Sequence, residues 1–178
     1  RAYGQFRFID RGKTTYPQGF AEELKKELQE MSKLALTKDE ASFLSRELPY
    51  LPPTYIDFVR GFRFDPEEVK VEQDAEGHLS IIAEGLLYRV TLWETPILAL
   101  VSELYYKMLG AQPDMEYTER TIISKARKLA EHGITFSMFG MRRRFSAAIE
   151  DRVTELLKEH AAGYLFGTSN VYYAYKHG

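Results

Sequence analysis

The chain has 178 residues, of which 44% are hydrophobic and 28% are charged, with a formal net charge of -2; this composition predicts a folded globular protein and excludes a disordered or polybasic nucleic-acid-binding chain. It contains no cysteine, which excludes disulfides, thiol catalysis and cysteine-based metal sites and fits the reducing cytoplasm, where we expect the protein to reside. Its longest strictly apolar run, Ile97–Val101, is far shorter than the roughly 20 residues that cross a bilayer, so no membrane partner is expected.

The first elements are predicted from side-chain periodicity. Residues 3–9 alternate aromatic and polar side chains, which predicts a strand, and residues 10–18 predict a loop. Apolar residues recur at helical spacing over about 19–35, so an amphipathic helix follows. Thr37 and Glu40 then form a capping box, which begins a second helix.

An antiparallel β unit is predicted in the middle of the chain. A short helix precedes it, beginning at Pro52 and Pro53 and ending at Gly61. The strands are expected at Val69–Gln73, Leu79–Ala83 and Leu86–Leu92, with a turn over 74–77.

Two helices open the second half. Thr95 as N-cap and Pro96 in the first turn predict a helix that Gly110 ends. Its apolar residues cover most of the circumference, so we expect it to be buried between layers or at a subunit contact. Another helix is predicted over about 118–132.

The last third alternates strands and helices. In order, it predicts a strand at 134–139, a loop at Gly140–Arg144, a helix capped by Ser146, a strand at 164–166, a loop at Gly167–Asn170 and a final helix. This βαβα order is typical of parallel strands in a doubly wound sheet or a barrel, where ligands bind at the carboxyl ends of the strands. If the two strands are neighbours, both loops face the same crevice.

The first loop carries three consecutive arginines, Arg142, Arg143 and Arg144. Guanidinium groups bind phosphate and carboxylate in a bidentate manner, but three neighbours cannot all point the same way. Some would therefore face solvent or pair with a glutamate, and a solvated basic turn is the alternative interpretation. A nucleic-acid contact is disfavoured because no second basic cluster supports it.

The second loop, Gly167, Thr168, Ser169 and Asn170, offers hydroxyls, an amide and backbone N–H groups at a helix N-terminus. Such an end attracts anions, although it is equally an ordinary helix start with Ser169 as the cap. Phe139, beside Gly140, can stack on a flat ring or belong to the core. The four histidines, His78, His132, His160 and His177, lack the spacing of a metal site, and no metal is predicted.

Five segments stand in the order found in the nicotinate phosphoribosyltransferase family, and the chain resembles that family from end to end. They are Tyr16–Ala21, Phe62–Pro66, Leu92–Tyr106, Phe139–Ser146 and Gly167–Val171. The resemblance implies formation of nicotinate mononucleotide and pyrophosphate from nicotinate and phosphoribosyl pyrophosphate, with ATP and Mg²⁺ as cofactors. It also implies a homodimer and a role in NAD biosynthesis.

The fold that this resemblance implies is an α+β N-terminal domain over residues 1–95, followed over 96–178 by linking helices and the start of the α/β barrel of type II phosphoribosyltransferases. The family's ring-sandwiching tyrosine and its phosphorylated histidine would lie before Arg1 and beyond Gly178. We therefore expect a fragment that is inactive alone, with no catalytic residue assigned within it.

The substrate-binding residues are also carried over from the family. Phe139 would stack on the pyridine ring, Arg142 would contact the phosphates, and Arg143 and Arg144 would support that pocket beside Gly140. Gly167, Thr168, Ser169 and Asn170 would line the nicotinate end. The related nicotinamide-using enzymes have an aspartate at the position of Ser169, and a hydroxyl can donate to a carboxylate that an aspartate would repel.

Two departures and two rival interpretations remain. Met141 stands where the family usually has threonine, and Met138 where it often has an acidic residue. The rivals are a nicotinamide-using relative and a non-catalytic module that uses the 96–109 helix as a partner surface and the arginine loop as an anion site.

Overall fold

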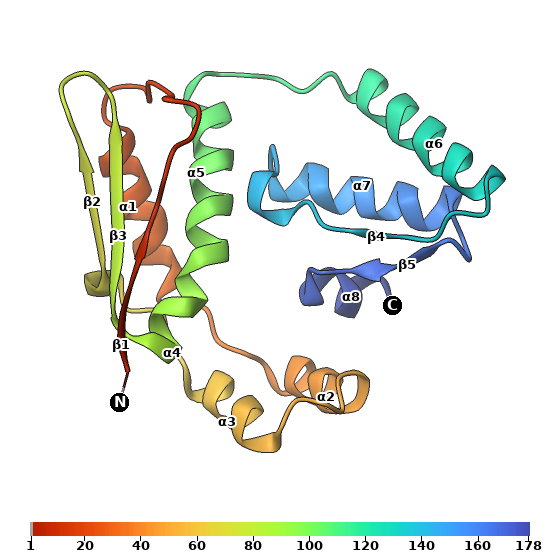
Figure 1. Cartoon of the computed structure of the whole chain (residues 1–178), viewed down its shortest axis with the longest axis horizontal. Coiled ribbons are helices and arrows are strands. Elements are labelled where there is room, and N and C mark those ends of the chain that lie inside the picture. Colours follow the sequence, from red (N-terminus) through yellow and green to blue (C-terminus); the bar gives the residue numbers. More distant parts are fainter. Residues whose placement is uncertain (1) are drawn as a thin grey trace. The chain divides into compact units, whose positions relative to one another are not determined.

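The computed structural model describes residues 2–178, which contain both helices and strands (Figure 1). The chain divides into two compact units, of which the first ends at Leu100 and the second spans Val101–Gly178. The mixed α/β content agrees with the predicted fold class. The boundary expected between residues 95 and 96 lies slightly earlier, and its assignment to two domains stays a prediction.

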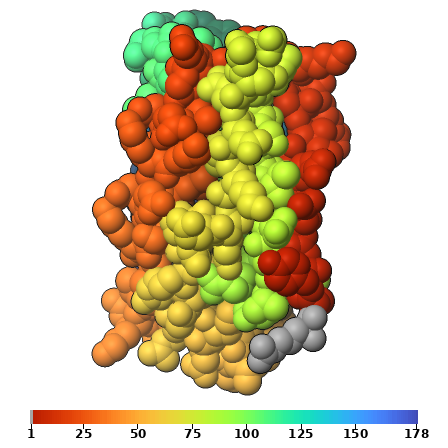
Figure 2. All heavy atoms as spheres, turned by 90° about the vertical axis from the view of Figure 1, so that its left-hand side faces the viewer, coloured from red at the N-terminus to blue at the C-terminus, as the bar shows by residue number. Residues whose placement is uncertain are grey.

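A three-stranded antiparallel sheet is the framework of the first unit. Its strands are β1 (Tyr3–Arg7), β2 (Val69–Gln73) and β3 (Leu79–Leu86), with β3 in the centre. The predicted antiparallel pairing of Val69–Gln73 with the strand that begins at Leu79 is confirmed, but the third strand is Tyr3–Arg7 and not Leu86–Leu92. Strand β3 pairs with β2 as far as Ala83 and with β1 as far as Leu86, which lies opposite Tyr3, so it is longer than the predicted strand. Figure 2 shows the β2–β3 hairpin, in yellow to green, between the orange helical segment and the red N-terminal segment.

Helix α1 (Phe20–Met31) packs against β2 through an apolar stripe. Phe20, Leu24 and Leu28 follow one another at intervals of four residues, and none is more than 2% exposed. This spacing places them on one helix face. The helix predicted over 19–35 is confirmed except for its last residues, which form a turn after Met31.

The segment Tyr16–Ala21 is fastened to the hairpin by Gln73. The Gln73 side-chain amide donates to the carbonyls of Tyr16 at 3.1 Å and Pro17 at 2.9 Å, and its oxygen accepts from the Ala21 N–H at 3.3 Å. This segment, the first of the five that carry the family resemblance, therefore has a structural role.

Two short helices follow α1. They are α2 (Lys38–Glu47) and α3 (Pro53–Gly61). The capping box at α2 is confirmed: the Glu40 N–H donates to the Thr37 hydroxyl at 3.2 Å, and the Thr37 N–H donates to the Glu40 carboxylate at 2.8 Å.

The chain after β3 is helical, and the strand predicted over Leu86–Leu92 is wrong. Helix α4 (Leu87–Val90) leads into the 3₁₀ turn η2 (Thr91–Trp93). Val90, Trp93 and Ile97 are 2%, 0% and 0% exposed, respectively. Intervals of three and four residues bring these side chains to one helical face, so burial selects the helix.

Trp93 organises the segment Phe62–Pro66. Its indole N–H donates to the Glu68 carboxylate at 3.0 Å, and the same carboxylate pairs with Arg89. The Phe64 ring lies 4.5 Å from the Trp93 ring, centroid to centroid. Glu68 ends the 3₁₀ turn η1 (Pro66–Glu68), which begins where the segment Phe62–Pro66 ends. Through its contact with Trp93, this second segment of the family resemblance also has a structural role.

Helix α5 (Glu94–Met108) begins directly after Trp93. Thr95 is therefore its second residue and not its N-cap, whereas Pro96 lies in the first turn as predicted. The expected burial is confirmed at Ile97 and Val101, which are at most 5% exposed. Within residues 2–178, no helix is both long and apolar enough to traverse a membrane.

The second unit contains a βαβα segment, as the sequence predicts. The segment consists of β4 (Phe136–Met138), α7 (Ala147–His160), β5 (Leu165–Thr168) and α8 (Val171–His177), and helix α6 (Met115–Glu131) precedes it. Strands β4 and β5 pair in parallel, and α6 packs along α7 (Figure 1). Ser146 caps α7 as expected, since its hydroxyl accepts from the Ile149 N–H at 3.2 Å.

Candidate functional site

The carboxyl ends of β4 and β5 lie side by side. Met138 is opposite Thr168 in the parallel ladder, and the Ser169 N–H donates to the Met138 carbonyl at 3.0 Å. The two predicted loops therefore leave the sheet at the same edge. The sequence predicts that the two loops face the same crevice only if their strands are neighbours, and in the structure they are neighbours.

An exposed aromatic ring stands at this edge. Phe139 is 74% exposed, whereas the preceding Met138 is only 8% exposed because strand alternation turns it toward α7. The Thr154 hydroxyl of α7 lies 3.0 Å from the Met138 sulfur. Met138 is thus a core residue, whereas the ring of Phe139 is exposed at the strand edge.

The first loop contains a short 3₁₀ helix, η3 (Met141–Arg143), where the sequence predicts irregular structure. The three arginines, two inside this 3₁₀ helix and one after it, differ in their exposure. Arg142 and Arg143 are exposed, while the side chain of Arg144 is only 17% exposed. The expectation that some of the three pair with glutamate is confirmed for Arg144.

Arg144 lies between two carboxylates of the second unit. Its Nε donates to Glu103 of α5 at 3.1 Å, and its Nη1 lies 3.9 Å from Glu150 of α7. The backbone of Arg144 is also held, because its carbonyl accepts from the Ser102 hydroxyl at 2.9 Å. Sequence reasoning missed both glutamates, since neither is near the arginines in a recognisable motif.

Glu150 is an unusual buried acid. The residue is 5% exposed, and its Oε2 has no hydrogen-bond partner among residues 2–178. Burial raises the pKa of this carboxyl; the Arg144 guanidinium opposes the rise, and the nearby Glu103 carboxylate adds to it. The same surroundings raise the pKa of Tyr173 to about 12, mainly through burial and secondly through Glu150.

The second loop is shorter than predicted, because Gly167 and Thr168 belong to β5. Asn170 is the N-cap of α8, which corrects the assignment of Ser169: the Asn170 side chain accepts from the Tyr172 N–H at 3.1 Å. Asn170 is 6% exposed and also donates its N–H to the Thr168 hydroxyl at 3.0 Å. Ser169 does not cap the helix and is exposed at the strand edge.

A group of potential metal ligands lies elsewhere in the second unit. Asp151, Glu155 and His177 each place one ligand atom within 4.8 Å of the others. The Asp151 carboxylate already accepts from His177 at 2.7 Å and from Lys176, and the hydrogen bond from Lys176 lowers its pKa. An ion would have to displace these partners, so the cluster is accounted for as an ion-pair network.

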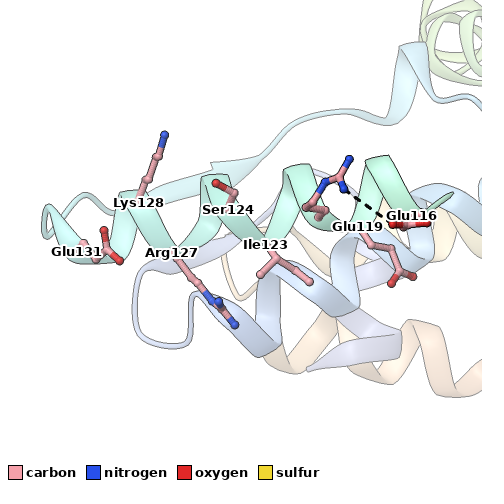
Figure 3. A pocket seen from close by; sticks show the side chains of 8 residues that line it. Glu116, Glu119, Ile123, Ser124, Arg127, Lys128 and Glu131 are labelled. Carbon is pink, nitrogen blue, oxygen red and sulfur yellow. Dashed lines mark ion pairs between the residues drawn. The ribbon is translucent and has the colours of Figure 1, made fainter. Parts of the chain in front are cut away.

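The hollow shown in Figure 3 is also distinct from the strand ends. It measures about 630 Å³ and is lined by side chains of α6 alone. They are Glu116, Glu119, Arg120, Ile123, Ser124, Arg127, Lys128 and Glu131. Three acids and three bases are among these residues, so the hollow favours neither sign of charge.

Chemically, the strand-end site combines an exposed ring, exposed guanidinium groups and a hydroxyl. The ring of Phe139 suits a flat aromatic group, and guanidinium groups suit phosphate oxygens. A ligand carrying an aromatic ring and a phosphate group fits this combination.

Comparisons with known proteins point to one family. Residues 1–102 match the model of the nicotinate phosphoribosyltransferase (NAPRTase) N-terminal domain, and residues 134–178 match that of the nicotinate phosphoribosyltransferase (NAPRTase) family. The chain is 40% identical to the nicotinate phosphoribosyltransferase of Chromohalobacter salexigens, with 99% of this chain and 45% of that protein covered. It is 33% identical to that of Methanococcoides burtonii, with 99% and 47% covered.

Solved structures agree with these sequence matches. The crystal structure of nicotinate phosphoribosyltransferase from Porphyromonas gingivalis superposes with a TM-score of 0.95 and 61% identity, covering 99% of this chain and 45% of that one. A putative nicotinate phosphoribosyltransferase from Saccharomyces cerevisiae superposes with a TM-score of 0.88 and 28% identity, covering 99% and 46%. The chain thus spans about half the length of the relatives that it matches.

Proposed function

The chain belongs to the nicotinate phosphoribosyltransferase family, and from this membership we propose that the protein containing it forms nicotinate mononucleotide and pyrophosphate from nicotinate and phosphoribosyl pyrophosphate. The observation that carries the proposal is the parallel pairing of β4 and β5, which brings Phe139 and the arginine loop to the same edge as Ser169. The product would feed NAD biosynthesis.

Each exposed group has a proposed role. Phe139 stacks on the pyridine ring, and Arg142 contacts the phosphates of phosphoribosyl pyrophosphate, with Arg143 beside it. As the bond to pyrophosphate breaks, negative charge grows on the leaving group, and fixed guanidinium charges stabilise it. Arg144 supports this pocket through its ion pair with Glu103 at 3.1 Å.

Ser169 is the proposed determinant of the acid substrate. Its hydroxyl can donate to the nicotinate carboxylate, and its position beside Met138 places it one residue away from Phe139. The Asn170 N–H donates to the Thr168 hydroxyl at 3.0 Å, and this hydrogen bond links the residues on either side of Ser169. Gly140 and Gly167 complete the two proposed substrate loops.

The remaining properties are proposed from family membership. They are coupling to ATP with Mg²⁺, assembly as a homodimer, a cytoplasmic location and continuation of β4 and β5 into an α/β barrel. Mg²⁺ prefers carboxylate oxygens, but Glu103 and Glu150, the carboxylates beside the arginine loop, face Arg144. They do not fit a metal site, so no described residue of this chain is assigned to ATP or Mg²⁺.

The test is turnover by the complete protein that contains this chain. We expect nicotinate mononucleotide to form from nicotinate, and nicotinamide to be a poor substitute; preference for nicotinamide would favour the nicotinamide-using alternative. Replacing Arg142 with alanine is expected to lower kcat/KM about 10- to 150-fold, the loss of one charged hydrogen bond.

Arg120→Ala is the matched control, because Arg120 is an exposed arginine of the same unit that pairs with Glu116 at 3.8 Å. Undiminished turnover in Arg142→Ala would refute the role of Arg142. Absence of any turnover by the unaltered protein, with nicotinate or with nicotinamide, would favour a non-catalytic module.

A further inference from the structure

Three groups of the segment that follows β4 are bound by one stretch of α5. The Ser102 hydroxyl donates to the Arg144 carbonyl at 2.9 Å. The Glu103 Oε2 accepts from the Arg144 Nε at 3.1 Å and also from the Ala147 N–H at 3.2 Å. Consecutive residues of a helix thereby hold the arginine loop at its last guanidinium and at the first residue of α7.

An aromatic contact lies beside these polar ones. The ring of Tyr106, one turn further along α5, stacks on Phe145 with a centroid separation of 4.5 Å and an interplanar angle of 17°. Such a contact stabilises the packing of the two rings beyond the effect of their buried area. The loop is therefore bound to α5 at its last arginine and at the residues that follow it, which restricts the conformations open to it.

The contacts that hold Arg144 also affect the positions of Arg142 and Arg143, which precede it in the loop. With Arg144 held against Glu103 and Glu150, the tight turn η3 leaves Arg142 and Arg143 on the exposed side. A guanidinium that is already oriented loses less conformational freedom when it binds an anion, and preorganised binding is tighter. The contacts of Glu103 are thus expected to influence affinity for a phosphate ligand that Glu103 does not touch.

We propose that Glu103 is a positioning residue for the phosphoribosyl pyrophosphate site. It fixes Arg144 and the start of α7, and so presents Arg142 and Arg143 to the substrate's phosphates; Ser102 has the same role to a smaller degree. This inference rests on the proposed function, since it assigns the substrate of the arginine loop.

Glu150 makes the role of Glu103 specific. Arg144 bears one positive charge between two carboxylates, and the ion pair with Glu103 is the shorter at 3.1 Å, against 3.9 Å for Glu150. The Oε2 of Glu150 has no hydrogen-bond partner among residues 2–178. Without the Glu103 carboxylate, Arg144 can turn toward Glu150, and the backbone that connects it to Arg142 and Arg143 would move with it.

The experiment measures steady-state kinetics of the complete protein with Glu103→Gln, Glu103→Ala and Ser102→Ala. Glu103→Ala is expected to raise KM for phosphoribosyl pyrophosphate roughly tenfold, with a smaller change in KM for nicotinate. Glu103→Gln should fall between Glu103→Ala and the unaltered protein, because its amide oxygen can still accept from Arg144 and Ala147.

The matched control is Glu119→Gln. Glu119 also accepts from an arginine Nε, that of Arg152 at 2.8 Å, but it lies in the contact between α6 and α7. We expect it to lower the melting temperature without raising KM for phosphoribosyl pyrophosphate. A scaffold role for Glu103 would give the same result, with a lower melting temperature and an unchanged KM.

The outcomes separate the two claims. Unchanged KM for phosphoribosyl pyrophosphate in Glu103→Ala, with turnover in the unaltered protein, overturns the positioning role alone. If Glu103→Ala does not fold, unchanged KM in both Glu103→Gln and Ser102→Ala overturns it in the same way. Absence of turnover in the unaltered protein overturns the proposed function, and the positioning role with it.

Discussion

Replacing Ser169 with aspartate places a negative charge where the proposed site receives the carboxylate of nicotinate. The side chain is exposed, and Ser169 is fixed through its backbone, since its N–H donates to the Met138 carbonyl at 3.0 Å. The substitution therefore leaves the strand-edge hydrogen bond in place. We expect Ser169→Asp to bind nicotinate less well than nicotinamide, which carries no charge.

The size of the effect depends on how far water screens the two carboxylates. Two like charges about 4 Å apart repel by about 1 kcal/mol in bulk water and by about 4 kcal/mol near a protein surface. At about 1.4 kcal/mol per tenfold change, this corresponds to a loss of about fivefold to nearly a thousandfold. Because Ser169 is exposed in this chain, we expect a loss of about tenfold.

The assay is a competition in which the complete protein converts a mixture of nicotinate and nicotinamide, and the ratio of their kcat/KM values is measured. Ser169→Asn is the control, since asparagine has the size of aspartate without its charge. If Ser169→Asp and Ser169→Asn change the ratio equally, charge at this position does not select the substrate, and the reasoning is refuted.

Three further predictions concern the free energy of unfolding, obtained from the midpoint and slope of a denaturant-unfolding curve. Leu24→Ala removes a side chain that is 0% exposed and should cost about 3 kcal/mol; a loss below about 1 kcal/mol would contradict its core position. Asn170→Ala removes the N-cap of α8 and should cost about 1 kcal/mol, whereas Ser169→Ala should cost almost nothing; equal losses would contradict the cap assignment. Burial raises the pKa of Glu150 above its ordinary value of 4.5, so the folded state loses stability as pH rises past 4.5 and through the folded pKa. Glu150→Gln should therefore gain stability relative to the unaltered protein as pH rises through that range, and a difference that stays constant with pH would contradict this.

Local patterns predicted those parts of the fold that local physics controls. The capping box of Thr37 and Glu40, the cap at Ser146 and the strand Val69–Gln73 were all recognisable because each depends on neighbours along the chain. The alternation of strands and helices also predicted parallel strands but left open whether the two are neighbours, and β4 and β5 do pair in parallel. That pairing brings the two candidate loops to one edge, as expected if the strands are neighbours.

The errors arose where burial by distant elements decided between local alternatives. The residues after Leu86 are rich in apolar side chains and suit a strand, but the buried positions Val90, Trp93 and Ile97 fit a helix. Ser169 and Asn170 are both good N-cap residues, and only the end point of β5 determines which one caps α8.

The partners of Arg144 could not be predicted from the sequence. Glu103 lies 41 positions earlier in the chain and Glu150 lies in the following helix, so only the packing of α5 and α7 around the loop brings them to the guanidinium. The sequence showed that three adjacent arginines cannot all reach a ligand. It did not show which of them turns inward.

The central claim is that the ends of β4 and β5 form the binding site for both substrates. A crystal structure of the complete protein with bound nicotinate mononucleotide tests this most directly. We predict that the pyridine ring stacks on Phe139, that its carboxylate lies near Ser169, and that a phosphate oxygen lies roughly 3 Å from the guanidinium of Arg142. A nucleotide bound away from this strand edge, or one with Phe139 and Arg142 turned from it, would contradict the claim.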